Sequence, residues 1–186
     1  MKRLVGIVLG LVFLAGCNAS EASLDRAMGL RAKLLGSSGC SFDTTISADY
    51  GDKTCTFQVS CQVDAAGTLL FTVKEPEVIA GVSGKIGGDG GELTFDDKAL
   101  AFPLLADDQL TPVSAPWIFI KTLQGGYVKS CGVDGDMVRV SIDDSYEEDA
   151  LRLDIWLGQD DLPVQAEILY RDRRILSLQI ENFQIL

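Results

Sequence analysis

The side chains that could do chemistry in this chain are carboxylates and thiols, because its 186 residues include no histidine. This excludes Ser-His-Asp triads, Cys-His pairs and histidine proton shuttles. No lysine has a serine three residues before it, so a Ser-Lys acyl enzyme is also unsupported. The 27 acidic residues could supply a carboxylate pair for hydrolysis, but their spacing singles out no pair. We therefore expect no enzymatic activity, and no cofactor.

The first residues have the pattern of an export signal. Lys2 and Arg3 form a basic start, and the apolar run 4–15 follows with 12 residues. A helix that spans a membrane needs ~20 apolar residues, so this run is too short. Residues 1–16 are therefore predicted to be a signal peptide.

The end of this segment, Leu14-Ala15-Gly16-Cys17, resembles the bacterial lipobox. In such motifs the cysteine thiol is alkylated with a diacylglycerol, and fatty acids such as palmitate then anchor the protein. We expect a lipid on Cys17, a short linker over 17–19 and a folded domain over 20–186. The expected location is the extracytoplasmic face of the cell membrane. The alternative is a plain secretory peptide with a chance cysteine.

Four further cysteines could form disulfides in that compartment: Cys40, Cys55, Cys61 and Cys131. Cys55 and Cys61 share one strand-like segment, which would place them ~20 Å apart, too far for a bond. One remaining pairing joins Cys40 to Cys61 and Cys55 to Cys131, and a hairpin turning at 51–53 favours it. The other joins Cys40 to Cys55 and Cys61 to Cys131. A single bridge with two free thiols, or a bridge between chains, is also open. No Cys-x-x-Cys occurs, so redox catalysis and a zinc site are not expected.

Acidic charge dominates the chain. Removal of residues 1–16 leaves 14 basic against 27 acidic residues, a net charge of -13. Such a domain repels phosphate backbones, so we expect no nucleic-acid partner. The acidic run 143–149 lacks the spacing and glycine of a calcium loop, and the glycines at 87–91 lack a phosphate-binding motif. We interpret both segments as solvated turns, so no metal site is expected.

The apolar periodicity predicts two helices and many strands. Residues 20–35 have helical spacing, and a second helix is expected from Trp117 to about Leu123 after a loop over 104–112. From Cys40 onward the period is two, with glycine-rich turns between strands. The fold class is thus mainly β (α+β), with about ten or eleven meandering antiparallel strands and two covering helices.

Two short helices cannot cover so long a sheet if it is flat. A sheet curled into an open half-barrel over the helices removes this difficulty. Such a shape can enclose an apolar hollow for an acyl chain, or its interior can be filled by side chains. Both readings are compatible with the pattern.

The order of these elements resembles a known family. The matching stretches are 24–35, ELTFDDKALAFP at 92–103, APWIFIKTLQGG at 115–126 and LPVQAEILYRDRRILSLQIENF at 162–183. They are similar to the LolA/LolB-type outer-membrane lipoprotein carrier and sorting superfamily, and nearest to lipid-anchored sorting and germination lipoproteins of clostridial type. The resemblance implies an open barrel, a lid of helices and an apolar cavity for acyl chains.

The leading hypothesis is therefore a membrane-anchored envelope protein that binds a lipid or a lipidated protein, with a role in lipoprotein sorting or spore germination. The alternatives are a scaffold for an envelope partner, with no lipid cargo, and an envelope hydrolase with two inward carboxylates. The candidate cavity-lining residues are the apolar ones expected on the inner face: Phe42, Ile46, Phe57, Val59, Phe71, Trp117, Ile120, Val140, Leu153, Ile155, Ile168 and Leu178.

Overall fold

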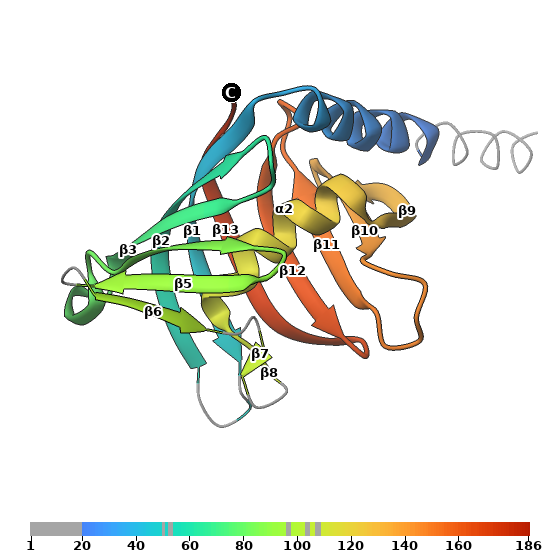
Figure 1. The fold of residues 1–186 in the computed structure, drawn as a ribbon. Helices are drawn as coiled ribbons and strands as arrows, with labels where there is room; N and C mark the ends of the chain where they lie inside the picture. Colours follow the sequence, from blue (N-terminus) through green and yellow to red (C-terminus); the bar gives the residue numbers. More distant parts are fainter. Residues whose placement is uncertain (1–19, 50, 52–53, 96–97, 103–104, 107–108) are drawn as a thin grey trace, which may run out of the picture.

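One antiparallel sheet of eleven strands forms the body of the protein (Figure 1). The computed structural model describes residues 20–49, 51, 54–95, 98–102, 105–106 and 109–186. The strand order is β6-β5-β4-β3-β2-β1-β13-β12-β11-β10-β9, so the first and last strands are neighbours in the middle of the sheet. The sheet curls but does not close, and the expected open half-barrel is confirmed.

The strands are connected mostly by short turns. Their bounds are β1 Gly39–Asp49, β2 Thr54–Asp64, β3 Leu69–Glu75, β4 Ser83–Gly87, β5 Gly90–Phe95, β6 Lys98–Phe102, β9 Tyr127–Asp134, β10 Met137–Asp143, β11 Leu151–Leu157, β12 Pro163–Tyr170 and β13 Arg173–Ile185. A separate small hairpin, β7 Leu105–Ala106 with β8 Gln109–Leu110, lies where the sequence predicted only a loop. Two short 3-10 helices, η1 Glu77–Ile79 and η2 Pro112–Ser114, complete the connections.

Helix α2, Ala115–Gly125, runs across the concave side of the sheet (Figure 1). Pro116 lies in its first turn, where the missing N–H of proline costs no hydrogen bond. Eight of its 11 residues are buried. A helix that is apolar on nearly every side belongs in an interior, and α2 supplies the cover that the concave face needs.

The N-terminal helix, residues 20–35, lies at one end of the half-barrel. It buries Ala27, Leu30 and Leu34, which follow one another at helical spacing. Leu24 and Met28 belong to a neighbouring stripe of the same helix and are about half exposed. In the part of the chain that the structure describes, no helix is long and apolar enough to span a bilayer.

A bulge in the central pair of strands is held by one carboxylate. The register between β1 and β13 shifts between Ser41 and Asp43. The Asp43 carboxylate accepts a hydrogen bond of 2.6 Å from the Ser60 hydroxyl and one of 2.9 Å from the Asn182 side-chain amide. These two hydrogen bonds lower the pKa of Asp43, because they favour its charged form. Asp43 thus joins β1 to both of its neighbours where the ladder is irregular.

Two adjacent glycines end α2, and only the second is closely packed. A Cβ on Gly126 would lie 2.6 Å from the Ile142 side chain and 2.8 Å from the Asp143 carbonyl oxygen, whereas a Cβ on Gly125 meets nothing within 4 Å. The backbone therefore approaches β10 so closely that a side chain does not fit.

We predict that Gly126→Ala lowers the free energy of unfolding by about 1–3 kcal/mol, because a methyl group would be forced against the backbone of β10. Urea denaturation measures this. The matched control is Gly125→Ala, which should be neutral or stabilising by up to ~1 kcal/mol, since alanine is the better helix former. Equal losses in the two variants would contradict the close approach.

The hydrogen bonds of Asp43 predict a dependence of stability on pH. Because the folded pKa is lowered, the stabilisation is present above the unfolded value of about 3.9 and is lost as pH falls through the folded pKa. Asp43→Asn should therefore cost about 1 kcal/mol near neutral pH and progressively less toward about pH 3. Urea titrations over this range measure the difference, and a difference independent of pH would contradict the prediction.

Candidate functional site

The concave face gathers the residues that the sequence predicted for a cavity. Eleven of the twelve belong to one buried core cluster, and Phe57 is half-buried. The strand register brings them together: Ile46 pairs with both Phe57 and Leu178, and Val140 pairs with Ile155. The predicted inner face is thus one continuous apolar surface across both halves of the sheet.

Most of these side chains are packed against other protein atoms. Ile46, Val140, Ile155, Ile168 and Leu178 have 0% exposed surface. A side chain without exposed surface touches neither solvent nor an internal void that admits water. These positions therefore border no water-sized void in the structure, and their predicted contact with a ligand stays a proposal.

An aromatic cluster fixes the middle of α2 to the sheet. The rings of Phe119 and Phe42 are nearly perpendicular at a centroid distance of 5.7 Å, and Phe42 stacks on Phe183 at 5.5 Å. Phe42 lies on β1 and Phe183 on β13, so one side chain of α2 reaches both central strands. Such pairs contribute about 0.5–1.5 kcal/mol each beyond simple burial.

Polar contacts hold α2 near its two ends. The Trp117 indole N–H donates to the Gly67 carbonyl oxygen at 3.2 Å, in the turn between β2 and β3. At the other end, the Arg31 guanidinium donates to the carbonyl oxygens of Leu123, at 2.8 Å, and Gly126, at 2.9 Å. The carbonyl groups at the end of a helix lack partners within it and carry partial negative charge, so a cation stabilises them.

Arg31 makes these contacts from a partly buried position on the N-terminal helix. Burial lowers its pKa, and the nearby Cys131 thiol acts in the opposite direction. The guanidinium therefore connects the N-terminal helix, the end of α2 and strand β9. The apolar periodicity of residues 20–35 contained no signal for this role.

The predicted disulfides are absent. All four cysteines are free, so the predicted bridges within the chain are wrong for this structure, whereas the alternative of a bridge between chains stays a prediction. Cys40 and Cys61 lie on adjacent strands, but Cys40 is opposite Val63, and Cys61 is opposite Phe42. Five strands separate β2, which carries Cys55 and Cys61, from β9, which carries Cys131. Burial raises the pKa of Cys40 to about 12 and that of Cys61 further, so both thiols stay protonated at neutral pH.

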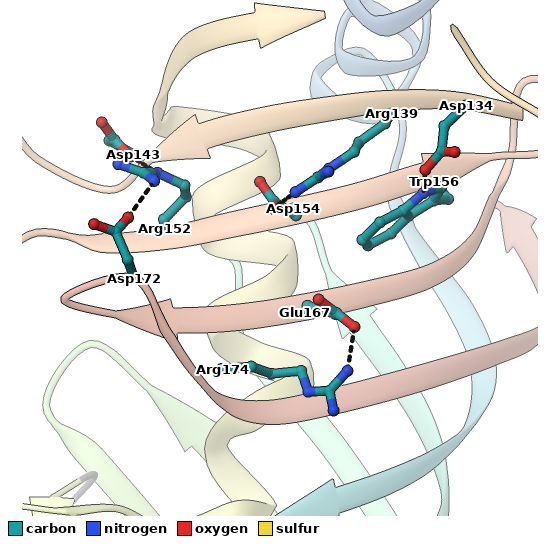
Figure 2. A network of polar contacts seen from close by, with 9 residues as sticks. All are labelled: Asp134, Arg139, Asp143, Arg152, Asp154, Trp156, Glu167, Asp172 and Arg174. Atoms are coloured by element: carbon teal, nitrogen blue, oxygen red, sulfur yellow. Dashed lines mark hydrogen bonds and ion pairs between the residues drawn. The ribbon is translucent and has the colours of Figure 1, made fainter. Parts of the chain in front are cut away.

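A polar network covers the other face of the sheet (Figure 2). Asp154 on β11 is 1% exposed and forms an ion pair with Arg139 on β10. The Arg139 guanidinium also lies 5.1 Å from the centre of the Trp156 ring, and the Trp156 N–H donates to Asp134 at 2.7 Å. The side chains of Asp154 and Trp156 are thus both buried on the convex face. Strand β11 is therefore buried on both faces of the sheet.

Ion pairs extend this network along the neighbouring strands. Arg152 bridges Asp143 and Asp172, at 3.0 and 2.8 Å, and Arg174 contacts Glu167 at 2.8 Å (Figure 2). Asp154 and Glu167 are directly opposite each other across β11 and β12. This carboxylate pair faces outward, and each member is engaged by an arginine, so it differs from the inward pair that the hydrolase hypothesis required.

The remaining predicted site lies outside the described residues. Cys17 and the segments 1–16 and 17–19 belong to that part of the chain.

A shallow depression of about 550 Å³ is present over β2–β5, lined by polar side chains such as Gln62, Thr72 and Glu92. Of the twelve predicted cavity residues, only Phe71 lines it.

No protein-family model matches the chain, and no curated protein matches it in sequence. Solved structures that are similar to it include a LolA superfamily protein from Nitrosomonas europaea, with 6% identity and a TM-score of 0.43 over 86% of this chain and 93% of the other. A putative outer membrane lipoprotein-sorting protein domain from Vibrio parahaemolyticus has 9% identity and a TM-score of 0.45, over 89% and 92%. Lipoprotein LppX from Mycobacterium tuberculosis has 12% identity and a TM-score of 0.43, over 87% and 93%.

Two of these structures carry names of the superfamily that the sequence resembles. The narrower resemblance to clostridial-type lipoproteins is not confirmed. At such identities and TM-scores, the likeness carries no information about what this chain binds.

Proposed function

We propose that this chain is a membrane-anchored envelope protein that binds an acyl chain, free or attached to a protein, between α2 and the concave face of its half-barrel. Cys17 carries the lipid anchor at the extracytoplasmic face. The twelve apolar residues predicted from the sequence provide the binding surface. The protein acts by binding and not by catalysis, in the sorting of lipoproteins or in spore germination.

The observation that carries this proposal is the apolar character of both contacting surfaces. The concave face and α2 meet through side chains such as Ile155, Leu178 and Phe119, which are fully buried. An acyl chain offers the same chemistry as these side chains, since burial of each methylene group contributes about 0.8 kcal/mol. A lipid can therefore replace contacts of α2 without leaving an apolar surface in water.

The polar contacts of α2 with the rest of the protein are concentrated near its ends. Trp117 and Arg31 make three hydrogen bonds there, to Gly67, Leu123 and Gly126. Displacement of α2 breaks these hydrogen bonds and separates the apolar side chains of α2 from those of the sheet. A bound ligand then replaces the lost apolar contacts. We therefore assign α2 the role of a movable cover, with Arg31 as the contact that keeps it closed.

The packing of the interior favours a second candidate, a scaffold for a protein partner without lipid cargo. Five of the proposed lining residues have no exposed surface. If α2 never leaves the concave face, the folded domain acts only through its outer surface.

Native mass spectrometry of the protein purified without detergent separates the two candidates. Lipid binding predicts retained lipid, or uptake of a fatty acid at a one-to-one ratio. The scaffold predicts recovery of one stoichiometric protein partner and no lipid in either experiment. A protein that neither retains nor accepts lipid contradicts the acyl-binding proposal.

We further predict that Arg31→Met increases uptake of a fluorescent fatty acid by about tenfold, because loss of charged hydrogen bonds to α2 lowers the cost of opening. Fluorescence titration measures the uptake, and circular dichroism checks that the fold is retained.

The matched control for this variant is Lys33→Met, an equal loss of charge at an exposed position two residues away. Its uptake should match that of the unchanged protein. A folded Arg31→Met protein with unchanged uptake would exclude Arg31 as the contact that keeps α2 closed.

A further inference from the structure

The N-terminal helix exposes an apolar stripe that the rest of the described structure leaves uncovered. Leu24, Met28 and Leu35 are 41%, 45% and 62% exposed. Their spacing of four and seven residues places them along one side of the helix. This stripe is separate from the buried one, so the helix has two apolar sides, of which only one packs on the sheet.

The position of this helix in the chain determines what the stripe can reach. Its first described residue, Ser20, is three residues from the lipobox cysteine, Cys17. Three residues span at most about 10 Å, even when fully extended. A lipid on Cys17 therefore keeps the start of the helix within about 10 Å of the membrane surface.

The distribution of charge favours an orientation in which this helix, and not the rest of the domain, faces the membrane. Residues 20–35 carry three basic and two acidic residues, a net charge of +1. Residues 36–186 carry 11 basic and 25 acidic residues, a net charge of -14. Bacterial membranes contain anionic lipids, which attract basic segments and repel acidic ones. The acidic body is therefore driven away from the surface, while the helix is not.

We propose that Leu24, Met28 and Leu35 insert into the boundary between headgroups and acyl chains of the membrane that holds Cys17. Amphipathic helices enter this boundary to a depth of about 5–10 Å. The helix then lies along the surface and fixes the orientation of the half-barrel relative to the bilayer. The inference rests on the membrane anchor of the proposed function, but not on lipid binding inside the half-barrel.

Quenching of tryptophan fluorescence by lipids with brominated acyl chains tests this contact. The lipidated protein is inserted through its own anchor into vesicles of phosphatidylcholine and phosphatidylglycerol. Met28→Trp and Leu35→Trp each add a reporter on the stripe. The unchanged protein gives the background, because its Trp117 and Trp156 are each only 8% exposed. The matched control is Val78→Trp, at a position on η1 that is 85% exposed.

The expected result is a loss of the added emission at both Met28→Trp and Leu35→Trp, and no loss at Val78→Trp. If quenching at either stripe position does not exceed that of the control, the proposal is overturned. The anchor is tested separately by Cys17→Ser, which should abolish association with vesicles. Anchored protein without quenching therefore rejects the docked helix alone, whereas vesicle association that survives Cys17→Ser rejects the anchor.

Discussion

The structure depends on one constraint, which is that an unclosed sheet must cover a wide apolar concave face. A closed barrel would cover this face by itself, but here β6 and β9 remain at opposite edges. Helix α2 takes over that task, and its composition follows from its position. Phe119 reaches both central strands, whereas Lys121 is exposed and lies over the ring of Trp117. The cover is held by burial along its length and by directed hydrogen bonds near its ends.

The polar network on the convex face includes a buried carboxylate on β11. Strand β11, at the middle of one half of the sheet, has buried side chains on both faces. Asp154 can be buried there because Arg139 supplies an opposite charge, since an isolated buried carboxylate would be strongly unfavourable. One Asp154 oxygen, Oδ1, nevertheless lacks a hydrogen-bond partner among the described residues. The buried Asp154 carboxylate is thus paired in charge with Arg139, while only one of its two oxygens has a hydrogen-bond partner in the described part of the chain.

Much of this fold could be predicted from alternation and helical spacing alone. The period of two from Cys40 onward predicted about ten or eleven antiparallel strands, and the segment after Pro116 predicted a helix where α2 lies. Periodicity reports which side chains share a face, and the twelve inner residues do share one. It does not report whether a face is covered by protein or left hollow, because that depends on how a distant helix docks. The contacts of Arg31 and the burial of Asp154 also depend on pairs far apart in sequence, for which a single sequence contains no signal.

The pairing of β1 with β13 has a consequence for how the chain matures. Eight register pairs join these strands, although some 130 residues separate them along the chain. Neither half of the sheet has its central neighbour until the last residues have emerged. Until then, the inner faces of the early strands stay uncovered. The finished sheet therefore assembles only after β13 has been made, and its central strand pair is among the last parts of the fold to form.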